Sequence, residues 1–173
     1  RALGYEAHAA RTSYLGPDPF QYLGTAIASP LITVTADRTI PHALGTAAWD
    51  DEGVPCTAFP LIRDGILVDY QTTREQAHWL APWYAKRGIL VQSHGCAIAE
   101  TALDCPIQMS PNFVLQPGSD AIDVDELIKD TKRGLYFPGG NADVDQQAGN
   151  GLFTMIPAPR EIRNGKLGAF LSD

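Results

Sequence analysis

Two short turns constrain the fold of this chain more than any other feature of its sequence. Asp64-Gly65 lies within the run Phe59–Tyr70, and Asn164-Gly165 lies within Glu161–Leu167. Both dipeptides are typical of type I′ turns, whose two central residues adopt a positive φ, and both have β-forming residues on either side. We therefore predict two antiparallel hairpins. Their shared pattern Ile-Arg-x-Gly-x-Leu is explained either by common turn chemistry or by an internal repeat.

One further strand and one loop are predicted from pattern alone. Apolar and threonine residues alternate over Ser29–Asp37, which indicates a strand with one solvated face. The segment Phe137–Leu152 holds four glycines together with Asn and Asp, and it predicts a long loop.

Helix signals occur at two places in the chain. Thr72 is the expected N-cap of a helix that ends near Pro82, with Glu75 as its capping-box partner. The run Asp123–Lys132 has apolar residues at helical spacing, and Gly134 is its expected C-terminal stop. The predicted fold class is α+β, a predominantly antiparallel sheet with β-hairpins and two or three helices, in a single domain spanning 1–173.

Composition excludes several classes of function. The chain has 173 residues and a formal net charge of −7, which argues against a broad phosphate-binding surface and hence against nucleic acid. No apolar run approaches the roughly 20 residues that a membrane helix needs, so we expect no membrane partner. The three cysteines favour a reducing compartment over a disulfide scaffold, which predicts a cytoplasmic protein.

The segment Ser93–Cys96 is the strongest local candidate for chemistry. On a strand, the spacing of His94 and Cys96 puts both side chains on one face, where they form either a nucleophile or metal pair, or a half-buried histidine beside a small core thiol. A thiol nucleophile needs His94 as its base and a third group to orient that base. Glu100 and Asp104 are the nearby candidates for this third group.

Gly95 interrupts an otherwise apolar stretch between Ile89–Val91 and Ala97–Ala99. A glycine in such a place predicts close approach of another backbone. We expect that backbone to be a bound substrate, so that His94, Gly95 and Cys96 line a substrate groove, or else a bulge at the edge of a sheet with no ligand nearby.

Asp50, Asp51 and Glu52 place three carboxylates in one turn before Gly53. Such a group either binds a hard cation or holds an acid of raised pKa, or it is a solvent-facing turn that caps strands. The sequence leaves their role open.

The ordered set of motifs resembles the TldD/PmbA family, once called modulators of DNA gyrase and now regarded as zinc metallopeptidases. The resemblance covers nearly the whole chain and is limited to the C-terminal half-domain of that family. It rests on these stretches: Arg1–Ala7, Asp37–Thr39, Asp50–Pro55, Leu61–Leu67, Thr73–Ala77, Pro111–Asn112, Pro117–Gly118, Asp125–Ile128, Gly134–Tyr136 and Asn164–Gly165.

The resemblance implies that the complete protein hydrolyses peptide bonds in unfolded or precursor peptides. Its zinc would be held by a His-Glu-x-x-x-His helix expected before Arg1 and by a cysteine expected beyond Asp173, with a further N-terminal domain upstream. We therefore expect no metal ligand and no catalytic residue in this chain, and we expect the chain alone to be inactive. Its strand-rich part would hold an extended peptide by main-chain pairing.

The resemblance also implies pairing, as a homodimer or as a heterodimer with a paralogous subunit. Two alternatives to a metallopeptidase fragment stay open at this point. One is a non-catalytic partner subunit, like TldE or PmbA, that lacks the metal motif. The other is a self-contained thiol hydrolase that uses Cys96 and His94.

Overall fold

A computed structural model describes residues 20–109, 111–118, 122–144, 150–154 and 158–171. The chain divides into two units. Unit 1 comprises Arg1–Pro117 with Gln146–Ala148, and unit 2 comprises Gly118–Asp145 with Gly149–Asp173. The Arg1–Ala7 stretch of the family resemblance lies outside the described residues, and the single domain over 1–173 stays a prediction.

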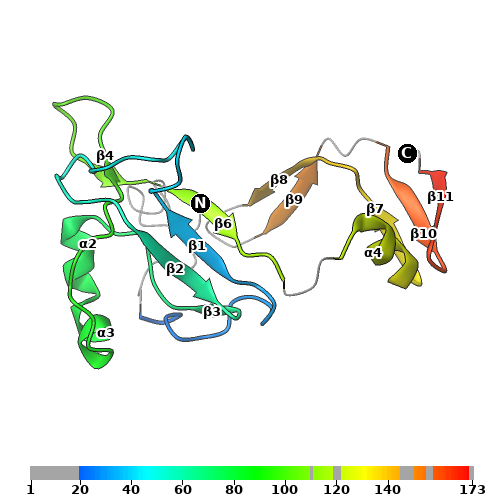
Figure 1. Cartoon of the computed structure of the whole chain (residues 1–173), viewed down its shortest axis with the longest axis horizontal. Helices are drawn as coiled ribbons and strands as arrows, with labels where there is room; N and C mark the ends of the chain where they lie inside the picture. Colours follow the sequence, from blue (N-terminus) through cyan, green and yellow to red (C-terminus); the bar gives the residue numbers. More distant parts are fainter. Residues whose placement is uncertain (1–19, 110, 119–121, 145–149, 155–157, 172–173) are drawn as a thin grey trace. The chain divides into compact units, whose positions relative to one another are not determined.

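Unit 1 is built on a four-stranded antiparallel sheet with the order β3-β2-β1-β6 (Figure 1). The strands are β1 (Val34–Asp37), β2 (Ala58–Arg63), β3 (Ile66–Leu67) and β6 (Asn112–Leu115). The strand predicted over Ser29–Asp37 is confirmed only from Val34 onward, because Ile32 N–H instead bonds Ser29 O at 2.9 Å and closes a turn after Pro30.

Both predicted hairpins are confirmed. Asp64 and Gly65 have φ of 50° and 77° and connect β2 to β3, while Asn164 and Gly165 have φ of 47° and 75°. These left-handed values are those of a type I′ turn. Gly65 is also required by space, since a Cβ at this position would lie 2.5 Å from the carbonyl oxygen of Ala28.

Two short helices follow the first hairpin. Helix α2 spans Arg74–Trp79 and α3 spans Ala81–Lys86. The predicted cap is wrong by one residue: Thr73 forms the capping box with Gln76, while Thr72 is buried and Glu75 sits one position too early. Helix α2 ends at Trp79, shortly before Pro82 as expected. Pro82 itself lies in the first turn of α3, where a backbone N–H has no partner within the helix and proline is therefore tolerated.

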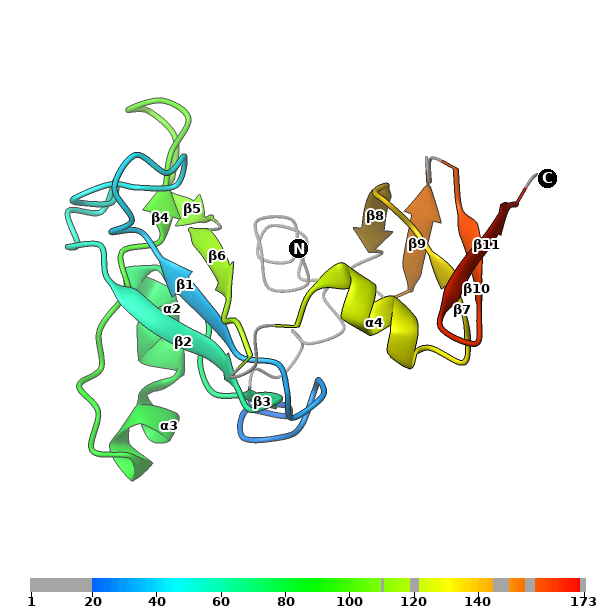
Figure 2. The same cartoon turned by 45° about the vertical axis from the view of Figure 1, so that its right-hand side comes forward.

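The rest of unit 1 is a small two-stranded sheet, seen in Figure 2. In it β4 (Ala97–Ile98) pairs antiparallel with β5 (Ile107–Gln108). This pairing fixes the residues that directly follow His94, Gly95 and Cys96.

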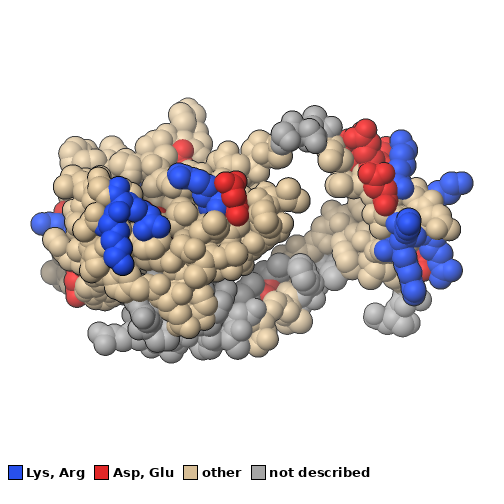
Figure 3. Space-filling view, turned by 90° about the horizontal axis from the view of Figure 1, so that it is seen from below, with Lys and Arg blue, Asp and Glu red and all other residues tan. Residues whose placement is uncertain are grey.

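The described residues of unit 2 form one helix and two antiparallel sheets. Helix α4 (Val124–Asp130) begins at the predicted cap Asp123, which forms a capping box with Glu126. The sheet β11-β10-β7 consists of β7 (Arg133–Tyr136), β10 (Arg160–Arg163) and β11 (Lys166–Phe170). Figure 3 shows Lys and Arg side chains gathered on this unit, at the right of the view.

Two predictions for unit 2 are wrong. Gly134 does not stop α4 but lies inside β7, since the helix already ends at its C-cap Thr131. The predicted loop over Phe137–Leu152 contains β8 (Asn141–Val144), which pairs with β9 (Gly151–Thr154). Cross-strand hydrogen bonds outweigh the local preference of a glycine-rich sequence here. The α+β class with mainly antiparallel strands is confirmed.

Candidate functional site

Asp69 is the centre of a buried polar network in unit 1. Its Oδ1 accepts hydrogen bonds from the Tyr84 hydroxyl at 2.7 Å and from the Tyr70 backbone N–H at 2.8 Å. Its Oδ2 lies 2.9 Å from Nε2 of His94. The other side of the His94 ring stacks on Phe59, with centroids 3.8 Å apart and planes 11° apart. His94 is thereby held in one orientation, with 14% of its side chain exposed.

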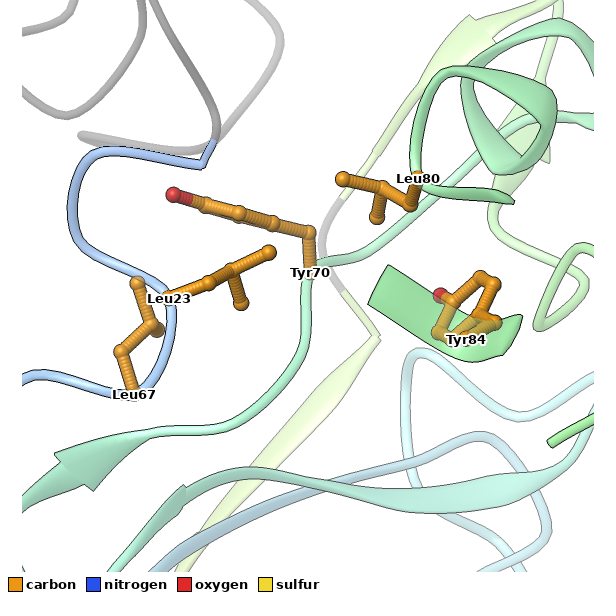
Figure 4. Packing of buried hydrophobic residues seen from close by; sticks show 5 residues of the cluster. All are labelled: Leu23, Leu67, Tyr70, Leu80 and Tyr84. Atoms are coloured by element: carbon orange, nitrogen blue, oxygen red, sulfur yellow. The ribbon is translucent and has the colours of Figure 1, made fainter. Parts of the chain in front are cut away.

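Tyr84 connects this network to the main apolar core (Figure 4). The core consists of Leu23, Leu67, Tyr70, Leu80 and Tyr84, from the segment before β1, the hairpin and α3. Burial, and then the adjacent Asp69 carboxylate, raise the pKa of the Tyr84 hydroxyl well above its usual range. Tyr84 is therefore a permanent hydrogen-bond donor to Asp69, and it keeps that carboxylate satisfied.

A close backbone approach does occur at Gly95, as its place in the sequence predicts. Gly95 has φ 72°, and a Cβ there would lie 2.7 Å from Cα of Cys56. Its carbonyl accepts from Nη1 of the buried Arg38 at 2.9 Å and from the Cys56 thiol at 3.3 Å. The backbone that approaches Gly95 thus belongs to this chain, and whether His94–Cys96 also line a substrate groove stays a prediction.

Cys96 is completely buried, against Ala36, Phe59 and Leu61. Burial raises the pKa of its thiol from the ordinary 9.0 to about 12, although the positive charge of Arg38 acts in the opposite direction. A neutral, inaccessible thiol is a poor nucleophile, so this arrangement argues against the thiol-hydrolase alternative. Moreover, Asp69 rather than Glu100 or Asp104 orients His94.

The acidic turn has a structural role, because each of its three carboxylates accepts hydrogen bonds from backbone N–H groups. Asp50 is buried and accepts from Glu52 N at 3.0 Å, Val54 N at 2.8 Å and Ala97 N at 3.1 Å. Asp51 accepts from Ala99 N at 2.7 Å. The third carboxylate, on Glu52, accepts from the first backbone N–H of α2, at Arg74. Of the alternatives above, the capping role is therefore the one that the hydrogen bonds support.

No three His, Cys, Asp or Glu side chains come together as a possible metal site within the described ranges. His94 has its Nε2 beside Asp69, and Cys96 is buried among apolar groups. The described residues therefore do not fit a zinc ion, which needs at least three protein ligands in a catalytic site.

Two members of the network were not found from sequence. Asp69 is the next-to-last residue of the hairpin run, and Tyr84 lies in an aromatic stretch that indicates core packing. The contact of Asp69 with His94 spans 25 residues and its contact with Tyr84 spans 15, so no local spacing signals them. The one sign of this network is the buried carboxylate of Asp69, which directly precedes Tyr70.

The fold and these contacts define an α+β protein of antiparallel sheets with a preorganised histidine and no assembled metal centre among the described residues. Residues 2–173 match the PmbA/TldA metallopeptidase C-terminal domain, and the chain belongs to this family. The family predicted from the motifs is therefore confirmed.

Two curated relatives share nearly a third of the aligned residues. A metalloprotease of Methanocaldococcus jannaschii is 32% identical over 152 residues, which cover 87% of this chain and 31% of that protein. The metalloprotease TldD homolog of Haemophilus influenzae is 31% identical over 146 residues, covering 84% of this chain and 28% of that protein. The chain thus spans less than a third of the length of these relatives.

Solved structures share the fold. TldE from Thermococcus kodakarensis superposes with a TM-score of 0.67 at 22% identity, over 98% of this chain and 35% of that one. A Thermotoga maritima protein described as a modulator of a DNA gyrase gives a TM-score of 0.69 at 18% identity, over 99% and 36% of the two chains. At these identities the likeness establishes the fold alone.

Proposed function

We propose that this chain belongs to a metallopeptidase that hydrolyses peptide bonds in unfolded or precursor peptides, and that it helps to hold the extended substrate. The observation that carries the proposal is the match of more than four-fifths of the chain to two proteins named metalloproteases, at 31–32% identity. Zinc is the metal proposed for the complete protein. The described residues make no site for it, so their proposed contribution is to bind and orient substrate.

The outer edge of β6 is the proposed binding strand. Gln116 N–H donates to Thr33 O at 2.9 Å, which makes these two residues a hydrogen-bonded pair of the β1–β6 ladder. Because such pairs alternate along an antiparallel ladder, the N–H and C=O groups of Phe113 and Leu115 point away from β1. No other strand pairs with this edge within the described part of the chain. It is therefore suited to main-chain pairing with an extended peptide.

The side chains along β6 suit the same role. Phe113 is 50% exposed and Leu115 is 63% exposed, and both lie on one face of the strand. Phe113 lies opposite Ala36, and Ala36 lies opposite Phe59, on which His94 stacks. We therefore propose that His94 lies on the face of the sheet that a peptide bound at this edge would contact. Gly95 and Cys96 would fix the backbone of His94.

Substitution of Phe113 tests the edge. In the metal-loaded, full-length protein, Phe113→Pro removes the outward N–H, whereas the matched control Phe113→Ala removes only the ring. Loss of one or two main-chain hydrogen bonds should lower kcat/KM for an unfolded peptide about tenfold in the proline variant relative to the alanine variant. Equal activity of the two variants would place the peptide elsewhere.

The non-catalytic partner subunit is the second candidate, and the fold likeness to TldE is the observation in its favour. Metal analysis of the full-length protein separates the two candidates, because only the catalytic subunit should retain stoichiometric zinc. We also propose assembly with a second subunit, identical or paralogous, and a cytoplasmic location. Cys56, Cys96 and Cys105 are all free thiols, which supports a reducing compartment.

A further inference from the structure

Five basic side chains gather at one end of unit 2, although the chain as a whole carries a net charge of −7. All five are exposed, and Figure 3 shows basic side chains on this unit, with acidic ones beside them. This basic patch consists of Lys129, Lys132, Arg133, Arg163 and Lys166.

Strand register fixes three members of the patch in one row. Arg133 of β7 lies directly opposite Arg163 of β10, and Arg163 lies directly opposite Lys166 of β11. Directly paired residues project from the same face of a sheet with their Cβ atoms about 5 Å apart. Three cations therefore lie side by side across three adjacent strands.

The turn of the same hairpin joins this row to the end of α4. Asn164 N–H donates to Lys132 O at 2.7 Å, and Gly165 N–H donates to Thr131 O at 3.0 Å. A Cβ on Gly165 would lie 2.6 Å from the carbonyl oxygen of Lys129. These contacts hold the backbone of Lys129 and Lys132 against the turn, beside the row.

Local stability does not account for the row. Like charges directly opposite each other on neighbouring strands are destabilising. Among the described residues, Arg163 pairs with Glu161 at 2.7 Å, but that arginine is 72% exposed and such surface pairs contribute little. The negative end of the α4 dipole favours Lys129 and Lys132, but it does not explain the cations of three strands.

The first hairpin shows that the turn itself does not require positive charge. Arg63 occupies the same position before its turn as Arg163, yet it faces Ile66 across the strands where Arg163 faces Lys166. The first turn residue also differs, being Asp64 in one hairpin and Asn164 in the other. The second hairpin thus has one negative charge fewer and one positive charge more than the first, on a turn of the same type.

We propose that the basic patch docks an acidic protein segment, a stretch of extended chain with several Asp or Glu side chains. The guanidinium groups of Arg133 and Arg163 match carboxylates in two-pronged geometry. The row spans three strands, about 10 Å, which fits two or three carboxylates rather than the 6–10 phosphates of a typical DNA site. The net negative charge of the chain also disfavours a long polyanion. This docking is independent of peptidase activity.

Binding of fluorescein-labelled hexaglutamate to the full 173-residue chain tests the proposal. The double variant Arg133→Gln/Lys166→Gln should bind the peptide about fivefold more weakly, since each exposed ion pair contributes modestly. Its melting temperature should be equal to or above that of the parent, because like-charge repulsion is relieved. Binding should also weaken as salt is raised.

The two hairpins supply a matched control. Arg163→Gln should weaken hexaglutamate binding, whereas Arg63→Gln, which makes the same change before the other turn, should leave it unchanged. Equal binding by the parent and the double variant would overturn the proposal. Tighter binding of a short labelled DNA duplex through the same residues would also overturn it, in favour of nucleic acid.

Discussion

At the scale of single residues, the carboxylate of Asp50 ties two segments of unit 1 together. Its Oδ1 closes the acidic turn by accepting from the amides of Glu52 and Val54, and its Oδ2 accepts from Ala97 at the start of β4. Ala97 directly follows Cys96, so Asp50 also fixes the strand that follows the segment of His94. Three amide donors thus occupy most of the roughly four acceptor positions of this buried carboxylate, which gives it a structural role.

We predict that Asp50→Asn lowers the free energy of unfolding by about 2 kcal/mol. In the variant an NH2 group replaces one carboxylate oxygen. This second donor then faces the amide N–H groups of Glu52 and Val54, or that of Ala97, and the hydrogen bonds there are lost. The control is Asp51→Asn, because Asp51 is exposed and has a single amide bond, to Ala99. Urea denaturation of both variants measures the difference in the free energy of unfolding. An equal decrease in the two variants would show that the hydrogen bonds of Asp50 stabilise the fold no more than the single bond of Asp51.

The three thiols should differ sharply in reactivity. Cys105 is exposed, whereas Cys56 and Cys96 are buried, and burial raises the pKa of both buried thiols. We predict that iodoacetamide at pH 8 alkylates one thiol, Cys105, in the native chain and all three after unfolding, as counted by mass spectrometry. Rapid native alkylation of Cys96 would revive the thiol-hydrolase alternative.

The same thiol predicts how stability depends on pH. The pKa of Cys96 is about 12 in the folded chain and 9.0 ordinarily, so between these values the unfolded chain has released a proton that the folded chain keeps. Fewer bound protons in the unfolded state mean that stability falls as pH rises through this window. The stabilisation present below about pH 9 is therefore lost progressively toward pH 12.

The sequence predicts the special backbone at Gly95 better than the partners of the candidate residues. That backbone is a local property, whereas the strand on which His94 and Cys96 were expected to lie begins only at Ala97. The partner of His94 is Asp69, which the fold brings close from 25 residues away. The burial of Cys96 likewise depends on Ala36, Phe59 and Leu61, from two other strands.

At the scale of elements, prediction succeeded where the backbone chemistry is local. Both type I′ hairpins and the Asp123 cap follow from residue types that few other conformations favour. The predicted cap Thr72 failed because Thr72 and Thr73 are equivalent as sequence signals: each precedes a Glu or Gln by three residues, and the capping box forms at Thr73 with Gln76. The β8–β9 pair was missed because its stability comes from cross-strand pairing that a glycine-rich sequence does not announce.

The first hairpin should tolerate no side chain at Gly65. We predict that Gly65→Ala lowers the free energy of unfolding by about 2 kcal/mol or more, since the new Cβ adds a collision with Ala28 O to the strain of positive φ. Gly53→Ala is the control, because Gly53 has a similar φ of 72° but open space around it, and it should cost about 1 kcal/mol. Thermal melts that rank Gly53→Ala as the worse variant would contradict the proposed packing.

At the scale of the whole molecule, family membership and chemistry rest on different kinds of evidence. Motif order and the match over residues 2–173 place the chain in its family, and the antiparallel sheets agree with its solved members. No described helix has the length and apolar character to cross a membrane. Among the described residues no group of metal ligands comes together, and the substrate-binding role of the β6 edge and of His94 is the proposal made above.

The absence of a ligand group among the described residues predicts how much zinc the 173-residue chain retains. A catalytic zinc needs three protein ligands, and the described residues bring no such group together. The Cys96 thiol would also have to lose its proton in an apolar core that raises its pKa to about 12. We therefore predict that the purified chain, dialysed against a weak chelator, retains far less than one zinc per molecule by elemental analysis. The full-length protein, treated identically, is the control and should retain about one zinc per catalytic subunit. Stoichiometric zinc in the short chain that disappears in His94→Ala would refute the assignment and identify His94 as a ligand.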